Sequence, residues 1–138
     1  MKTSLCILSL LIGLSSITFG AKSPKGFTPI FNGKDLTGWW GLKTEDPAKW
    51  MALSAGELKK KKQASIEDIK QHWKVQDGVL VNDGKGLYLS TAKNYGDFEL
   101  MLDYKTVAGA DSGIYLRGVP QIQIWDTTEK AGKWKLGA

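Results

Sequence analysis

From Trp73 onward, the sequence places apolar and polar residues in short alternating runs that are separated by turn-forming residues. Asp77-Gly78 joins the runs 73–76 and 79–82 and is typical of a two-residue β-hairpin loop, because both residues tolerate the positive φ angles of such a turn. A spacing of two favours strands, since successive side chains of a strand point to opposite faces. Further strands are expected at 87–90, 98–105, 112–117 and 121–126. This succession predicts a mostly-β fold of the sandwich or jelly-roll type.

Residues 46–72 interrupt the strand pattern, because they hold good helix formers and almost no β-branched residues. Asp46 before Pro47 predicts a helix start with proline at its first position. Two further starts are indicated by pairs with capping-box spacing, Ser54 with Glu57 and Ser65 with Asp68. The segment is therefore expected to form two or three short helices laid against a sheet.

The first residues have the pattern of a secretory leader. Lys2 precedes a short apolar run, and small and polar residues follow up to Gly20. The apolar run is much shorter than the roughly 20 residues of a membrane-spanning helix. Residues 1–20 are therefore expected to be a signal peptide, removed before Ala21 on export to the periplasm or beyond, with 21–25 as a tether. Once cleaved, the chain is not expected to bind a membrane.

Cys6 is the only cysteine of the chain and lies inside this leader, so the domain is expected to be held by its core alone. His72 is the only histidine, and a structural role is favoured for it over catalysis. A dedicated zinc site is therefore not expected. A carboxylate-bound calcium or other divalent ion is left open, although no loop signature supports it. The sequence predicts no cofactor.

The formal net charge is +5, which raises the question of an acidic partner such as nucleic acid. Much of the excess lies in one run, Lys59–Lys62, inside the expected helical segment. A solvated helix face is the favoured reading, and nucleic-acid binding is not expected because aromatic residues do not alternate with the lysines. The oligomeric state is left open.

Three of the expected strands each present polar or aromatic side chains on one face. These side chains are Glu99, Met101, Asp103 and Lys105 on the first strand, Tyr115 and Arg117 on the second, and Gln121, Gln123 and Trp125 on the third, opposite Ile122 and Ile124. Sugar hydroxyls need such donors and acceptors, and the C–H faces of a sugar pack against aromatic rings. The pattern predicts a carbohydrate site, with simple solvent exposure as the alternative.

The run 27–31 is interrupted by Pro29 and is expected as an edge strand. Counting it, the chain offers six or seven strands, whereas a jelly roll has about eight. Nothing after Asp126 has a strand pattern. The domain 26–138 is therefore expected to be an incomplete jelly roll whose last strands are missing.

Several ordered motifs carry a resemblance to a known family. They are Gly26-Phe27, Ile30 to Leu36 with Gly38-Trp39, Trp73 with Asp77 to Leu80, Tyr95 to Leu100, and Asp111 to Arg117. In this order they resemble the 3-keto-disaccharide hydrolase family, from about Gly26 to the end of the chain. The resemblance implies a concanavalin A-like jelly roll, export, and cleavage of glycosides already oxidised at C3. It also implies a mechanism of C2 proton abstraction, elimination and hydration.

Carried over by position, the resemblance suggests Asp103 as base or sugar ligand, Arg117 as the group that holds the oxyanion, and Asp126 as a further acid. The implied substrate-binding residues are Glu99, Asp111, Ser112, Tyr115, Gln121, Gln123 and Trp125. Gln121 departs from the family, since many relatives carry glutamate there and an amide cannot act as a base. The rival readings are a lectin-like carbohydrate-binding module without catalysis and a purely structural domain.

Overall fold

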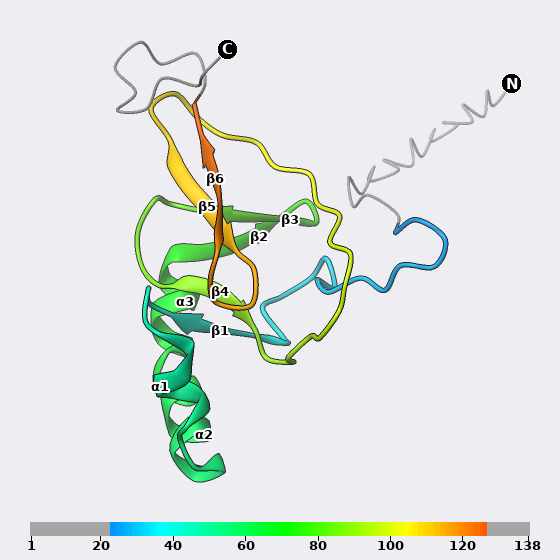
Figure 1. Ribbon diagram of the computed structural model, residues 1–138. Coiled ribbons are helices and arrows are strands. Elements are labelled where there is room, and N and C mark those ends of the chain that lie inside the picture. The colour runs from blue at the N-terminus through cyan, green and yellow to red at the C-terminus, as the bar shows by residue number, and fades with distance from the viewer. Residues whose placement is uncertain (1–22, 127–138) are drawn as a thin grey trace, which may run out of the picture.

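The computed structural model describes residues 23–126, and within them the chain forms six strands and three helices (Figure 1). In chain order these are β1 (Trp39–Leu42), α1 (Pro47–Met51), α2 (Ala55–Ala64), α3 (Ile66–His72), β2 (Trp73–Gln76), β3 (Val79–Asn82), β4 (Tyr88–Thr91), β5 (Asp111–Tyr115) and β6 (Gln121–Trp125). The expected signal peptide lies outside the described residues. No helix of the described part has the length and apolar character that crossing a membrane requires.

The strands pair into three antiparallel sheets of two strands each, β1 with β4, β2 with β3, and β5 with β6. Small sheets with short helices are compatible with a β-sandwich. Within residues 23–126, these pairs do not join into the two larger sheets of a jelly roll. The jelly roll therefore stays a prediction.

The expected hairpin is confirmed. Trp73 of β2 lies opposite Asn82 of β3, and Gln76 lies opposite Val79. Between the two strands, Asp77 has φ 49° and Gly78 has φ 77°. Both loop residues must take positive φ angles in the turn type whose twist matches that of the flanking strands, which explains the Asp-Gly pair.

The helical insert is also confirmed, with three helices between Pro47 and His72. Asp46 caps α1 by accepting a hydrogen bond from the Ala48 amide at 2.9 Å. Ser54 and Glu57 form both bonds of a capping box at the start of α2. Local capping chemistry thus sets the first two helix starts.

The second predicted capping box, Ser65 with Asp68, is wrong. Ser65 lies in helical conformation between α2 and α3, and its side chain does not cap α3. Its hydroxyl instead donates to the Lys62 carbonyl at 2.7 Å and accepts from the Gly41 amide at 2.8 Å. Because α2 and α3 follow each other so closely, the hydroxyl bonds back to the preceding turn and across to β1. Asp68 likewise reaches out of the helix and accepts from the Leu87 amide at 2.7 Å.

The core lies where α3 packs on β1. Ile69 is fully buried and Trp40 is 3 % exposed. Gly41 is needed here, since a Cβ atom on it would lie 2.7 Å from Leu87 Cδ1 and 2.8 Å from Ile69 Cγ2. Figure 1 shows α1 and α2 below β1, while the β5–β6 hairpin extends away from them.

Two expected strands are wrong. Residues 27–31 form no strand and bend at 30–31, and residues 98–105 form no ladder with another described strand. The alternation at 98–105 nevertheless has a structural meaning, because Phe98, Leu100, Leu102 and Tyr104 line one open hollow of about 310 Å³ together with Ile114, Leu116, Ile122 and Ile124. Alternation reports which side chains share a face, whereas a ladder also needs a neighbouring backbone within about 5 Å.

Candidate carbohydrate site on the β5–β6 hairpin

The β5–β6 hairpin has one polar and one apolar face. Its register places Asp111 opposite Trp125, Gly113 opposite Gln123, and Tyr115 opposite Gln121. Residues directly opposite each other share a face, so these six form the polar face. The polar face thus unites five of the expected binding residues, Asp111, Tyr115, Gln121, Gln123 and Trp125. Ser112 lies opposite Ile124 and therefore on the apolar face.

A hydrogen bond fixes the polar groups at the centre of this face. The Gln123 side-chain amide donates to Asp111 Oδ1 across the two strands. This bond leaves the carbonyl oxygen of Gln123 as an acceptor. The side chain of Gln121 lies over Gly113, where a Cβ atom would come within 2.7 Å of Gln121 Cγ. The absence of a side chain at Gly113 therefore makes room for the side chain of Gln121.

Two tyrosines join this face to the rest of the molecule. The rings of Tyr115 on β5 and Tyr88 on β4 have centroids 5.9 Å apart. Thr44 Oγ1 donates to the Tyr88 hydroxyl at 3.3 Å and lies 3.5 Å from the Tyr115 hydroxyl. Sequence reasoning missed Tyr88 and Thr44, because their positions depend on packing between sheets. The signal available in the sequence was a large aromatic residue, Tyr88, in a short expected strand. In the structure this side chain is 49 % exposed.

Arg117 is not on the strand face where the sequence analysis put it. β5 ends at Tyr115, and Arg117 lies in the following turn with φ 55°. The turn is closed by the Leu116 amide, which donates to the Pro120 carbonyl at 2.9 Å. Because the chain reverses within these residues, Arg117 does not continue the alternation of β5. Its side chain is exposed at the turn end of the hairpin.

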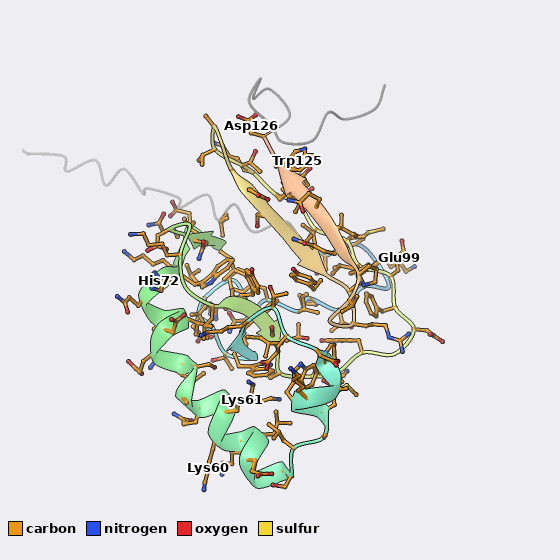
Figure 2. The ribbon with its side chains drawn as sticks, turned by 60° about the vertical axis from the view of Figure 1, so that its left-hand side comes forward. Lys60, Lys61, His72, Glu99, Trp125 and Asp126 are labelled. Atoms are coloured by element: carbon orange, nitrogen blue, oxygen red, sulfur yellow. The ribbon has the colours of Figure 1, made fainter. Side chains whose placement is uncertain are left out.

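Asp126 lies at the opposite, open end of the hairpin, as Figure 2 shows. Its carboxylate accepts from the Gly109 amide at 3.0 Å, and its own amide donates to the Ala110 carbonyl at 3.0 Å. Asp126 therefore ties down the loop before β5. Five paired residues of about 3.3 Å each separate this end from the turn that holds Arg117.

Asp103 and Glu99 are exposed on the segment 98–105. Figure 2 places Glu99 well apart from Trp125 and Asp126. Within the described residues, no hydrogen bond or ion pair joins Asp103 to Arg117 or Gln123. Between residues 23 and 126, no three carboxylate, imidazole or thiol side chains gather into a group that could hold a metal ion.

His72 makes its contacts outside this face. Its Nδ1 lies 2.9 Å from the Asp83 carboxylate, and the pair joins the end of α3 to the turn after β3. The hydrogen bond with His72 holds the pKa of the Asp83 carboxyl below its usual value of 3.8. A Cβ atom on Gly86, which has a positive φ, would meet the His72 ring. These contacts fit the structural role expected for His72.

Comparison with known proteins gives two matches. A family described as a 3-keto-alpha-glucoside-1,2-lyase-like domain matches residues 26–138. A curated 3-keto-disaccharide hydrolase of Bacteroides thetaiotaomicron is 32 % identical over 91 residues, which cover 65 % of this chain and 27 % of the relative. The matched part thus spans about a quarter of that relative. No solved structure matches the chain.

Proposed function

We propose that this chain, which belongs to the 3-keto-alpha-glucoside-1,2-lyase-like family, is an exported enzyme that cleaves 3-keto-disaccharides. Membership supports the substrate class, and the curated hydrolase supports cleavage with release of a free sugar. The polar face of the β5–β6 hairpin is the proposed place of binding. The observation that carries this assignment is the Asp111–Gln123 hydrogen bond on the face that also presents Tyr115.

The chemistry we propose begins with the ketone. A carbonyl at C3 acidifies the proton at C2, so a base removes that proton and an enolate forms. The electrons of the enolate then form the C1–C2 double bond as the C1–O bond breaks, and the leaving oxygen takes up a proton. Water adds to C1 and a proton returns to C2, which completes a net hydrolysis. A positioned base and an oxyanion partner are the groups that such a path needs.

Three residues are proposed for these roles. Asp103 is the candidate base or sugar ligand, Arg117 the candidate partner of the enolate oxygen, and Asp126 the candidate acid. Asp103 and Arg117 are solvent-exposed and free to reach a bound sugar. Asp126 is the most constrained of the three, since its carboxylate already accepts from the Gly109 amide.

The test is turnover in D₂O. The purified chain is incubated with a 3-keto-disaccharide, and the free sugars are followed by NMR. Elimination and hydration would place deuterium at C2 of the released keto sugar as it forms, whereas direct displacement at C1 would not. A parallel sample of free 3-keto sugar with the same protein corrects for later exchange. Absence of any release would contradict the proposed enzyme.

Variants test the assignment of residues. Asp103→Asn and Arg117→Ala should each lower kcat/KM by about a hundredfold or more, because they remove a base and a charged partner. Asp97→Asn is the matched control, since Asp97 is an exposed carboxylate just before the same segment and has no proposed role. Full activity in both site variants would show that the assignment is wrong even if the chain is an enzyme.

A lectin-like module is the second candidate. The large separation of the catalytic candidates favours it, because groups that are far apart cannot act together on one bond. Arg117 and Asp126 lie at opposite ends of the hairpin, and Asp103 lies on another segment. A module would bind the 3-keto-disaccharide without releasing sugar. It would also lose binding on Gln123→Ala, which breaks the bond to Asp111.

Export is proposed from the leader pattern of residues 1–20. Expression of the full chain in a Gram-negative host should place the protein in the periplasm with Ala21 as its first residue. N-terminal sequencing of that fraction is the measurement. An intact leader on a cytosolic protein would contradict the proposal.

A further inference from the structure

A second hollow lies away from the β5–β6 hairpin, between α2, β1 and the residue after β4. Its volume is about 410 Å³. Its walls include Trp39, Trp40, Leu58, Lys59, Lys62 and Ile66. No lining residue belongs to the β5–β6 hairpin or to the segment 98–105. The volume falls in the range of about 300–1,000 Å³ that is typical of small-molecule sites.

The polar lining of this α2 hollow carries positive charge only. Lys59 and Lys62 contribute ammonium groups, and no lining residue is acidic. Lys62 is held in place, because its Nζ donates to the Ala92 carbonyl at 3.1 Å and lies 5.3 Å from the Trp40 ring centroid. Such contacts fix an ammonium group without neutralising it.

The other two lysines of the run 59–62 do not line the hollow. Lys61 forms an ion pair with Glu45 at 2.8 Å, and its charge is therefore compensated. Lys60 is exposed and does not line the hollow. Figure 2 shows Lys60 extending from the outer side of α2 and Lys61 on the side of α2 that faces α1. Four consecutive lysines thus divide into two that border the hollow and two that do not.

Trp39 adds an apolar wall to the hollow, whereas Trp40 is only 3 % exposed and belongs to the core. The Trp39 indole N–H is enclosed and finds no acceptor among residues 23–126. Because this N–H is enclosed, Trp39 offers the hollow the apolar surface of its ring rather than a hydrogen-bond donor. By contrast, the Trp40 indole N–H already donates to the Thr91 carbonyl at 3.2 Å.

We propose that the α2 hollow binds an acidic sugar, a uronate unit, with its carboxylate at Lys59 and Lys62 and its apolar ring face against Trp39 and Leu58. The positive lining selects a carboxylate, and the adjoining aromatic and aliphatic wall selects a ligand that also has an apolar face. The choice of a sugar as the carrier of the carboxylate rests on the function proposed above. The hollow is too small for a folded macromolecule, which excludes the bulk of an acidic protein as its occupant.

The test uses three probes on the full chain labelled with ¹⁵N. A glucuronate-containing disaccharide should shift the Trp39 indole signal, which is identified by its loss in Trp39→Phe. Cellobiose, a neutral disaccharide, should bind at least about tenfold more weakly, since it lacks the charge-assisted bonds. Benzoate, an aromatic carboxylate without sugar, should also bind more weakly. Equal binding of cellobiose or stronger binding of benzoate would overturn the proposal.

Two charge-reversal variants on one helix locate the site. Lys59→Glu should weaken uronate binding by about tenfold or more, whereas Lys60→Glu should change it by less than about twofold. Both variants change the net charge equally, so a general electrostatic effect predicts equal losses and would overturn the assignment. Thermal unfolding confirms that each variant is folded.

The proposed reaction and the proposed uronate site can be tested independently of each other. A chain that binds the uronate disaccharide at Trp39 but releases nothing from a 3-keto-disaccharide would contradict the proposed reaction and support the α2 hollow. A chain that releases sugar but shows no uronate shift would contradict the α2 hollow alone.

Discussion

The helix-packed region, residues 39–91, and the hairpin region, residues 98–126, differ in how they are held. In the helix-packed region, Trp40 and Ile69 are buried, and the Trp73 indole N–H donates to the Leu87 carbonyl at 2.9 Å. In the hairpin region, only Ile124 is buried among the described residues, and Ile122 is 51 % exposed. Packing thus stabilises one region, while the polar candidate site lies on the other. The proposed chemistry therefore lies in the less enclosed of the two regions.

The sharpest test of this contrast is a pair of truncations. Ile69→Ala should destabilise the protein by about 2–5 kcal/mol, because it opens a cavity in a fully buried position. Ile122→Ala should cost less than about 1.5 kcal/mol, since half of that side chain already faces water. Urea unfolding at neutral pH gives both free energies. Similar losses for the two variants would contradict the difference in packing between the two regions.

Added volume probes the same contrast with a smaller effect. Gly41→Ala should cost about 1–3 kcal/mol, because its Cβ would press on Leu87 and Ile69. Gly113→Ala should cost less, since the group it meets is the exposed side chain of Gln121, which can swing away. The matched measurement is again the unfolding free energy. A larger loss for Gly113→Ala would place tight packing in the hairpin region instead.

The smallest expected effect is a dependence on pH. Because the folded-state pKa of Asp83 is lowered, its contribution to stability is present above its usual value of 3.8 and is lost as the pH falls through the lowered pKa. The stability difference between wild type and Asp83→Asn should therefore shrink as the pH falls below about 3.8. Thermal unfolding between pH 2 and 7 measures it.

Asp103→Asn is the control for this pH series. Asp103 lies in the hairpin region and makes no hydrogen bond within the described part of the chain. Its removal should change acid stability less than Asp83→Asn does. The opposite order would show that the hairpin region depends on its carboxylates for folding.

Sequence reasoning succeeded where neighbouring residues decide the structure. The Asp77-Gly78 turn, the Asp46 cap and the Ser54–Glu57 box depend on groups within a few residues, and all three were predicted. The shared face of Gln121, Gln123 and Trp125 followed from alternation within one strand.

Sequence reasoning failed where the structure depends on contacts between residues that are distant in the sequence. Residues 98–105 alternate correctly, but pairing depends on where another backbone lies. Arg117 left its strand because the turn that closes on Pro120 begins one residue after Tyr115. The contact of Tyr88 with Tyr115 joins two sheets that no local pattern relates.

The pairing of β1 with β4 has a consequence for the order of folding. Trp39 lies opposite Thr91, so the two strands meet only after the whole stretch between them has turned back. Closing a long flexible loop is entropically costly, and contacts distant in sequence slow folding. The intervening helices and the β2–β3 hairpin are built from contacts close in sequence, and we expect them to form first and bring the two strands together. β1 and β4 would then join last, as the closing step of a structure already assembled inside their loop.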